Sequence, residues 1–113
     1  MHELSIAINI VDIATSEVRK AGAERVTDLQ IDVGALSGVV VDALAFALQE
    51  AVRNSVAEQA RISIREIPAR GSCRMCGREY PVSDYIDLCP ECPSASLEII
   101  EGKELCVASL SVV

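Results

Sequence analysis

The sequence predicts an α/β fold of the α+β type, in which two helices pack on one face of a small mixed or antiparallel sheet. Two segments of the chain have apolar residues at helical spacing, and four others have the alternation or composition of strands. Residues 68–96 differ from both classes, because they are rich in cysteine, glycine and proline and poor in large apolar side chains. We therefore expect the fold to contain an inserted four-cysteine domain.

The two helices are predicted from residues 4–20 and from Asp42 to about Asn54. In the first, the apolar residues recur every three or four positions, and Gly22 supplies a C-terminal stop. In the second, the Asp42 side chain is expected to cap the N-terminus. The apolar face of the first helix consists of Leu4, Ala7, Ile8, Val11, Ala14 and Val18, and that of the second of Leu44, Leu48, Ala51 and Val52.

Four strands are expected, at residues 26–33, 61–67, 97–101 and 104–112. The last two flank Gly102 and Lys103, which predicts a hairpin. The final strand is expected to bury one side, made of Cys106, Ala108, Leu110 and Val112. The chain would then divide into one α/β domain of residues 1–67 plus 97–113 and a cysteine-bearing domain of residues 68–96.

The four cysteines of the insert follow the pattern C-x2-C-x12-C-x2-C, at Cys73, Cys76, Cys89 and Cys92. Paired cysteines two residues apart can direct both sulfurs at one point, so the pattern predicts a structural tetrahedral zinc site in a zinc-ribbon-like domain. Disulfides, a dithiol redox pair and iron are the alternatives, and Cys106 is interpreted as a small buried residue. The insert has too few apolar residues to fold alone, so we expect it to be unfolded without metal.

The two cysteine pairs are not equivalent in sequence. Gly77 follows Cys76 and permits the tight turn that directs backbone N–H groups at sulfur, whereas Pro93 follows Cys92 and has no N–H. We expect Cys89 and Cys92 to be the more labile half of the site.

Composition limits the possible functions of the chain. It has 113 residues and a net charge of −7, which disfavours binding to a phosphate backbone. No apolar run approaches the roughly 20 residues of a membrane span, and the first residues lack the pattern of a signal peptide. We therefore expect a cytoplasmic protein that binds neither nucleic acid nor membrane.

The first residues offer a second kind of metal site. A free amine at Met1, the amide nitrogen of His2 and its imidazole can close adjacent chelate rings. A further amide or the Glu3 carboxylate can complete a planar set that suits Ni(II) or Cu(II). The alternative is that His2, the only histidine, is an ordinary surface residue.

The start Met1-His2-Glu3-Leu4-Ser5, the chain length and the two C-x-x-C pairs together resemble the HypA/HybF family of hydrogenase maturation nickel-insertion proteins. The resemblance implies a metallochaperone, not an enzyme, with Ni(II) as transient cargo at Met1, His2 and Glu3 and structural Zn(II) at the four cysteines. It implies delivery to the large subunit of [NiFe]-hydrogenase with a HypB-like GTPase, and in some members a role in urease maturation. The alternative function is a zinc-ribbon adaptor without nickel transfer; we expect a monomer or a homodimer.

Overall fold

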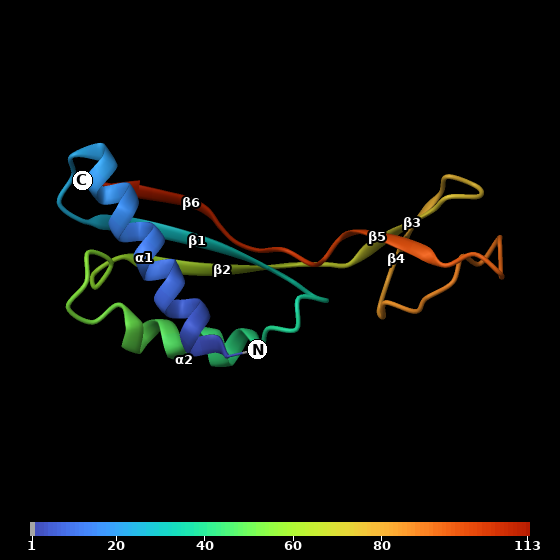
Figure 1. The fold of residues 1–113 in the computed structure, drawn as a ribbon, viewed down its shortest axis with the longest axis horizontal. Coiled ribbons are helices and arrows are strands. Elements are labelled where there is room, and N and C mark those ends of the chain that lie inside the picture. Colours follow the sequence, from blue (N-terminus) through green and yellow to red (C-terminus); the bar gives the residue numbers. More distant parts are fainter. Residues whose placement is uncertain (1) are drawn as a thin grey trace.

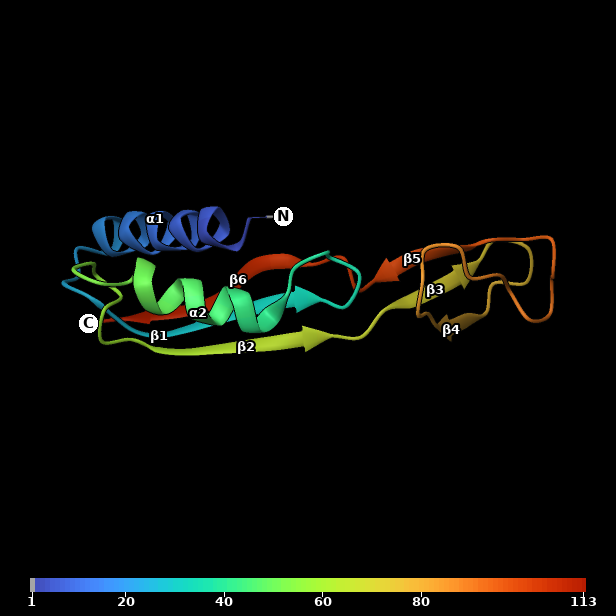
Figure 2. The same ribbon diagram turned by 90° about the horizontal axis from the view of Figure 1, so that it is seen from below.

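Eight elements follow one another along the chain in the computed structural model, which describes residues 2–113. They form two three-stranded sheets joined end to end in a molecule of 54 × 26 × 17 Å (Figures 1 and 2). No described helix is long and apolar enough to cross a membrane. The elements are α1 (Glu3–Ala21), β1 (Val26–Gly34), α2 (Val41–Ala51), β2 (Arg61–Ile67), β3 (Arg70–Cys73), β4 (Glu79–Pro81), β5 (Leu97–Glu101) and β6 (Leu105–Val112).

The first sheet has the strand order β2-β1-β6, with β2 parallel and β6 antiparallel to the central strand. Both helices lie on one face of it, as Figure 2 shows, so the predicted fold class is confirmed. Burial of the apolar side of each element against this face accounts for the main core. That core contains Ala7, Ile10, Ala14 and Val18 of α1, Val26, Leu29, Ile31 and Val33 of β1, Leu44, Ala47 and Leu48 of α2, and Val52 and Ala57.

The predicted end of α1 is confirmed, whereas the predicted ends of α2 are wrong. Helix α1 ends at Gly22, which has the left-handed φ of 63° expected of a C-terminal glycine. The prediction that Asp42 caps α2 is wrong, because the helix begins at Val41 and Val40 occupies the cap position. Asp42 lies in the first turn, where its charge still interacts favourably with the helix dipole. The helix also ends before Asn54, whose own φ of 59° is left-handed.

The predicted hairpin between residues 97–101 and 104–112 is wrong. Strand β5 pairs with β3 in the second sheet, of order β4-β3-β5, whereas β6 pairs with β1 in the first. Residues 102–104 connect β5 in one sheet to β6 in the other. They do not close a turn, and their carbonyls instead accept hydrogen bonds from residues at and just beyond the end of β1. The N–H of Gly34 donates to the carbonyl of Glu104 at 2.7 Å, and the N–H of Leu36 donates to that of Gly102 at 2.7 Å.

The predicted burial of Cys106 and Ala108 is also wrong. The pairing register of β1 and β6 shifts between Gln30, opposite Ser109, and Ile31, opposite Val107. This bulge adds one residue to β6 and reverses which side chains face the helices. Leu105, Val107, Leu110 and Val112 pack on the core, while Cys106 is exposed.

The two sheets meet where three backbone segments cross without intervening side chains. A Cβ atom at Gly34 would overlap the carbonyl group of Gly102. One at Gly102, whose φ is +108°, would come within 2.5 Å of the Cα of Ala69. Because these neighbours are backbone atoms, no side-chain rotation can make room, and the crossing depends on glycine at both positions.

Replacing Gly34 by alanine should therefore force the crossing strands apart. In the metal-loaded chain, we expect Gly34→Ala to lower the free energy of unfolding in urea by at least about 3 kcal/mol. The matched control is Gly38→Ala, where φ is +81° but no atom lies within 4 Å of the added Cβ. This control should lower the free energy of unfolding by only about 1 kcal/mol, the cost of a left-handed backbone conformation at a residue that has a Cβ. Equal losses for the two variants would show that the crossing is not tightly packed.

Candidate metal centres

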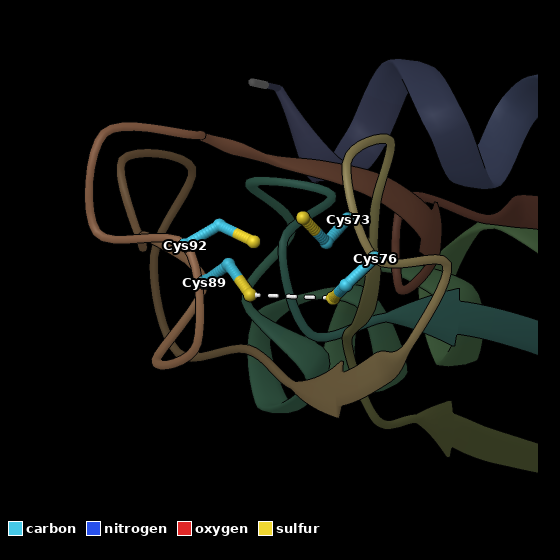
Figure 3. A group of neighbouring side chains, drawn as sticks. All are labelled: Cys73, Cys76, Cys89 and Cys92. Atoms are coloured by element: carbon cyan, nitrogen blue, oxygen red, sulfur yellow. Dashed lines mark hydrogen bonds between the residues drawn. The ribbon is translucent and has the colours of Figure 1, made fainter.

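The structure brings the four predicted cysteines of the insert to one point. Cys73 ends β3, Cys76 lies in the turn that follows, and Cys89 and Cys92 lie in the segment between β4 and β5 (Figure 3). Their sulfurs all lie within 4.8 Å of one another, and those of Cys76 and Cys89 are 3.7 Å apart. Four sulfurs at a zinc–sulfur distance of 2.3 Å in a tetrahedron would be about 3.8 Å apart. The donor set and its spacing therefore fit a tetrahedral zinc ion.

The first cysteine pair has the turn that the sequence predicts. Gly77 has a φ of +74°, and its N–H donates to the carbonyl of Cys73 at 2.8 Å. This turn directs the backbone N–H of Cys76, and that of Met75, at the Cys73 sulfur, which lowers the pKa of Cys73 to about 7. Cys73 can therefore bind metal as a thiolate near neutral pH.

The second pair is held by backbone bonds around Ala95. The N–H of Cys89 donates to the carbonyl of Ala95 at 3.0 Å, and the N–H of Ala95 donates to that of Cys92 at 2.8 Å. Burial, and then the neighbouring Cys73 sulfur, raises the pKa of Cys92 to about 12. The causes of this contrast with Cys73 are burial and the neighbouring sulfurs, and the greater lability of Cys89 and Cys92 stays a prediction. A bound cation would balance the charge of the clustered thiolates and so remove the cost of ionising Cys92.

The hydroxyl of Tyr80 gives independent support for a metal-bound sulfur. This hydroxyl is buried and has no hydrogen-bond partner within residues 2–113. Burial raises the pKa of Tyr80, and the nearby Cys89 sulfur raises it further. A metal-bound thiolate at Cys89 would accept the hydrogen bond that the hydroxyl lacks.

The second sheet has little apolar material besides the cysteines themselves. Its buried cluster consists of Ala69, Cys73, Val82, Cys89 and Leu97, so two of the five residues are metal-ligand candidates. A cluster of this size supplies too little burial to order about thirty residues, so the sheet needs the bound ion.

The predicted nickel residues lie at the start of α1, apart from the sulfur cluster. His2 is exposed, with φ −86° and ψ 104°, and its carbonyl accepts the first helical bond from Ile6 at 3.3 Å. Glu3 begins the helix, and its Oε2 accepts a hydrogen bond from the N–H of Val40 at 3.4 Å. Met1, the third predicted residue, lies outside the described residues.

The contact between Glu3 and Val40 was not predicted from the sequence. The two residues are 37 positions apart, and Val40 carries no polar side chain that would have indicated a role. The contact exists because α1 crosses α2 near the beginning of both helices. It also provides a charged acceptor at the N-terminus of α2, whose cap residue offers none.

Comparison with known proteins places this arrangement in a family. A family model described as "Hydrogenase/urease nickel incorporation, metallochaperone, hypA" matches residues 1–112. The chain belongs to the HypA family. It is 40% identical over 112 residues to the hydrogenase maturation factor HypA of Geobacter metallireducens, covering 99% of both chains. It is 42% identical over 113 residues to that of Geotalea daltonii, covering 100% of both.

Two solved structures share the fold of this HypA family member. The solution structure of the nickel metallochaperone HypA from Helicobacter pylori has a TM-score of 0.72 at 20% identity, with 100% of this chain and 98% of that chain covered. A second solution structure of a HypA protein has a TM-score of 0.76 at 21% identity, with coverage of 100% and 97%. The family is one of metallochaperones and maturation factors, not of catalysts.

Removing the metal with a chelator should unfold the cysteine-bearing part of the chain alone. We expect amide hydrogen exchange to become fast in residues 70–101, because the small apolar cluster there needs the ion. Protection in β1, β2 and β6 should persist, because their core contains no cysteine. Cys73→Ser should reproduce this pattern without chelator. Unchanged protection of residues 70–101 after complete metal removal would contradict the assignment.

Proposed function

We propose that this chain binds Ni(II) at Met1, His2 and Glu3 and delivers it to the large subunit of [NiFe]-hydrogenase during maturation. In the same proposal, Cys73, Cys76, Cys89 and Cys92 hold a structural Zn(II) ion. The observation that carries the proposal is the position of an exposed His2 and a half-buried Glu3 at the start of α1, in a chain whose family is described by nickel incorporation. The first sheet with its helices would be the nickel-binding domain, and the cysteine-bearing sheet the zinc-binding domain.

The start of α1 is suited to a chelate that includes backbone nitrogen. The helix begins at Glu3, so the N–H of His2 lies before the helix and contributes no bond to it. A metal can therefore replace the proton on this nitrogen without breaking a helical hydrogen bond. The His2 imidazole is exposed and able to reach the same ion, and Oε1 of Glu3 remains available while Oε2 bonds to Val40.

Transfer follows from the difference between the two sites. Four sulfur ligands leave no open position on zinc, so that ion stays in place. An exposed site of terminal nitrogens can instead lose its ligands one at a time as a receiving protein offers its own. A HypB-like GTPase is the partner we propose for the nickel cycle, urease maturation is the second use we propose, and the cytoplasm is the proposed location.

Nickel affinity should depend on both His2 and a free N-terminus. In isothermal titration of the zinc-loaded chain, we expect His2→Ala to weaken Ni(II) binding at least about tenfold, because an imidazole ligand is lost. A chain extended by a few residues before Met1 should lose Ni(II) affinity by a similar factor, because its terminal amine no longer lies next to His2. Ser5→Ala, at an exposed position in the first turn of α1, is the control and should bind Ni(II) normally. Unchanged affinity in both test variants would exclude this nickel site.

A further inference from the structure

We infer that Cys76 is a modification site, at which hydrogen peroxide oxidises the sulfur cluster and so releases its metal ion. The oxidised product is a disulfide between Cys76 and Cys89. The inference rests on the zinc part of the proposed function and adds to it the ligand that reacts first and the class of reagent, a small neutral peroxide.

The four cysteines of the cluster differ in their access to solvent. Cys73 and Cys89 are buried, with exposed fractions of 1% and 0%, and Cys92 is half-buried. Cys76 is exposed, in the turn that follows β3 (Figure 3). A Cβ atom added at the next residue, Gly77, would meet no atom within 4 Å. The cluster is therefore open to a small reagent on the Cys76 side, and oxidation of thiolates follows exposure as well as thiolate character.

A buried sulfur lies in position to complete the oxidation. The sulfurs of Cys76 and Cys89 are 3.7 Å apart and contact each other directly (Figure 3). The Cys73 sulfur accepts hydrogen bonds from the backbone N–H groups of Met75 and Cys76. These bonds stabilise the charge on the Cys73 sulfur and make it a weaker nucleophile. Cys89 is therefore the partner that attacks an oxidised Cys76.

The oxidation consists of two steps whose atoms and electrons balance. The Cys76 thiolate sulfur attacks peroxide, so that an S–O bond forms, the O–O bond breaks, and the departing hydroxide takes a proton from solvent to become water. The Cys89 thiolate sulfur then attacks the sulfur of the Cys76 sulfenic acid. The S–S bond forms, the S–O bond breaks, and a second hydroxide takes a proton from solvent. The two thiolates together lose two electrons, and peroxide is reduced to two water molecules.

This oxidation removes half of the ligand set. Thiolate, not disulfide, is the form of cysteine that binds metal, so the ion is left with Cys73 and Cys92 alone. The buried cluster of the cysteine-bearing sheet contains only five residues and needs the ion, so residues 70–101 should lose their order. The main core contains no cysteine and should persist. Oxidation at Cys76 would thus disorder one sheet and leave the other folded.

Charges around the cluster favour a neutral reagent over an anionic one. The three arginines of residues 68–96 all form ion pairs with carboxylates, so none offers an uncompensated charge to an anion. The pairs are Arg70–Glu79 at 3.5 Å, Arg74–Glu98 at 2.9 Å and Arg78–Glu91 at 3.8 Å. The chain has a net charge of −7, and zinc held by four thiolates adds about two more negative charges. An anionic disulfide such as oxidised glutathione is repelled by this field, whereas hydrogen peroxide is not.

The test locates the first oxidised residue in the zinc-loaded full chain. Cys106→Ser removes the exposed cysteine of β6, outside the cluster, and should release zinc within about twofold of the native rate. This variant is treated with hydrogen peroxide and dimedone, which traps sulfenic acid, and mass spectrometry finds the labelled residue. Without dimedone, a chromogenic chelator follows zinc release and mass spectrometry maps the disulfide. We expect the label at Cys76, a disulfide between Cys76 and Cys89, and zinc release in step with disulfide formation.

Two further variants separate the exposed ligand from a less exposed one. Cys76→His and Cys92→His each keep four zinc ligands, because histidine replaces one sulfur. We expect Cys76→His to slow zinc release by peroxide at least about tenfold, because the exposed thiolate is gone. Cys92→His keeps that thiolate and should release zinc clearly faster than Cys76→His. If either variant fails to bind zinc, the label and the disulfide map in Cys106→Ser decide the question.

The outcomes separate this inference from the proposed function. A first label at another cysteine of the cluster, a disulfide that does not join Cys76 to Cys89, or equal slowing in the two histidine variants overturns the inference. Retention of zinc under peroxide that oxidises Cys76 also overturns it. The zinc assignment stands in each of these cases, because the ion was bound before peroxide was added. If the purified chain holds no zinc at its cysteines, the zinc assignment fails and the inference fails with it.

Discussion

The close approach of Gly34 to Gly102 is the constraint on which the relative position of the two sheets depends. At this point the end of β1, the link between β2 and β3 and the link between β5 and β6 touch through backbone atoms. Leu36, just beyond the crossing, packs against the apolar cluster of the cysteine-bearing sheet, and its carbonyl accepts a bond from the Tyr85 hydroxyl. The same loop continues to Val40, which bonds to Glu3. One short segment thus contacts both the cysteine-bearing sheet and the N-terminal site.

The two candidate centres differ in the chemistry that a metal would meet. The sulfur cluster lies within a small sheet, with Cys73 and Cys89 buried and four soft donors converging on one position. The proposed N-terminal site has an exposed His2 and a half-buried Glu3, with nitrogen and oxygen donors, at the start of a helix that the main core holds in place. Ligand type and geometry, more than raw affinity, decide which metal a site selects. A soft tetrahedral site and a hard, open one can therefore keep a structural ion and a cargo ion apart in one small protein.

Local signals predicted most of the fold and the sulfur cluster, while the N-terminal nickel site stays a prediction. Helical periodicity and Gly22 located α1, alternation located β1 and β2, and cysteine spacing located the sulfur cluster. Apart from the ends of α2, where Asp42 and Asn54 were local signals that misplaced the helix, the errors concern information that local patterns do not contain. The pairing of β5 with β3 is decided by the crossing at Gly102, and the outward position of Cys106 by a bulge that appears only when β6 is aligned with β1. The Glu3–Val40 bond joins residues brought together by the packing of two helices.

Separation of the two metals by ligand type is tested most directly by X-ray absorption at the nickel and zinc edges of one sample loaded with both ions. The zinc edge should show four sulfur neighbours at about 2.3 Å. The nickel edge should show only nitrogen and oxygen neighbours, in the planar arrangement that suits Ni(II). Sulfur in the nickel coordination shell, or fewer than four sulfurs around zinc, would contradict the assignment of the two sites.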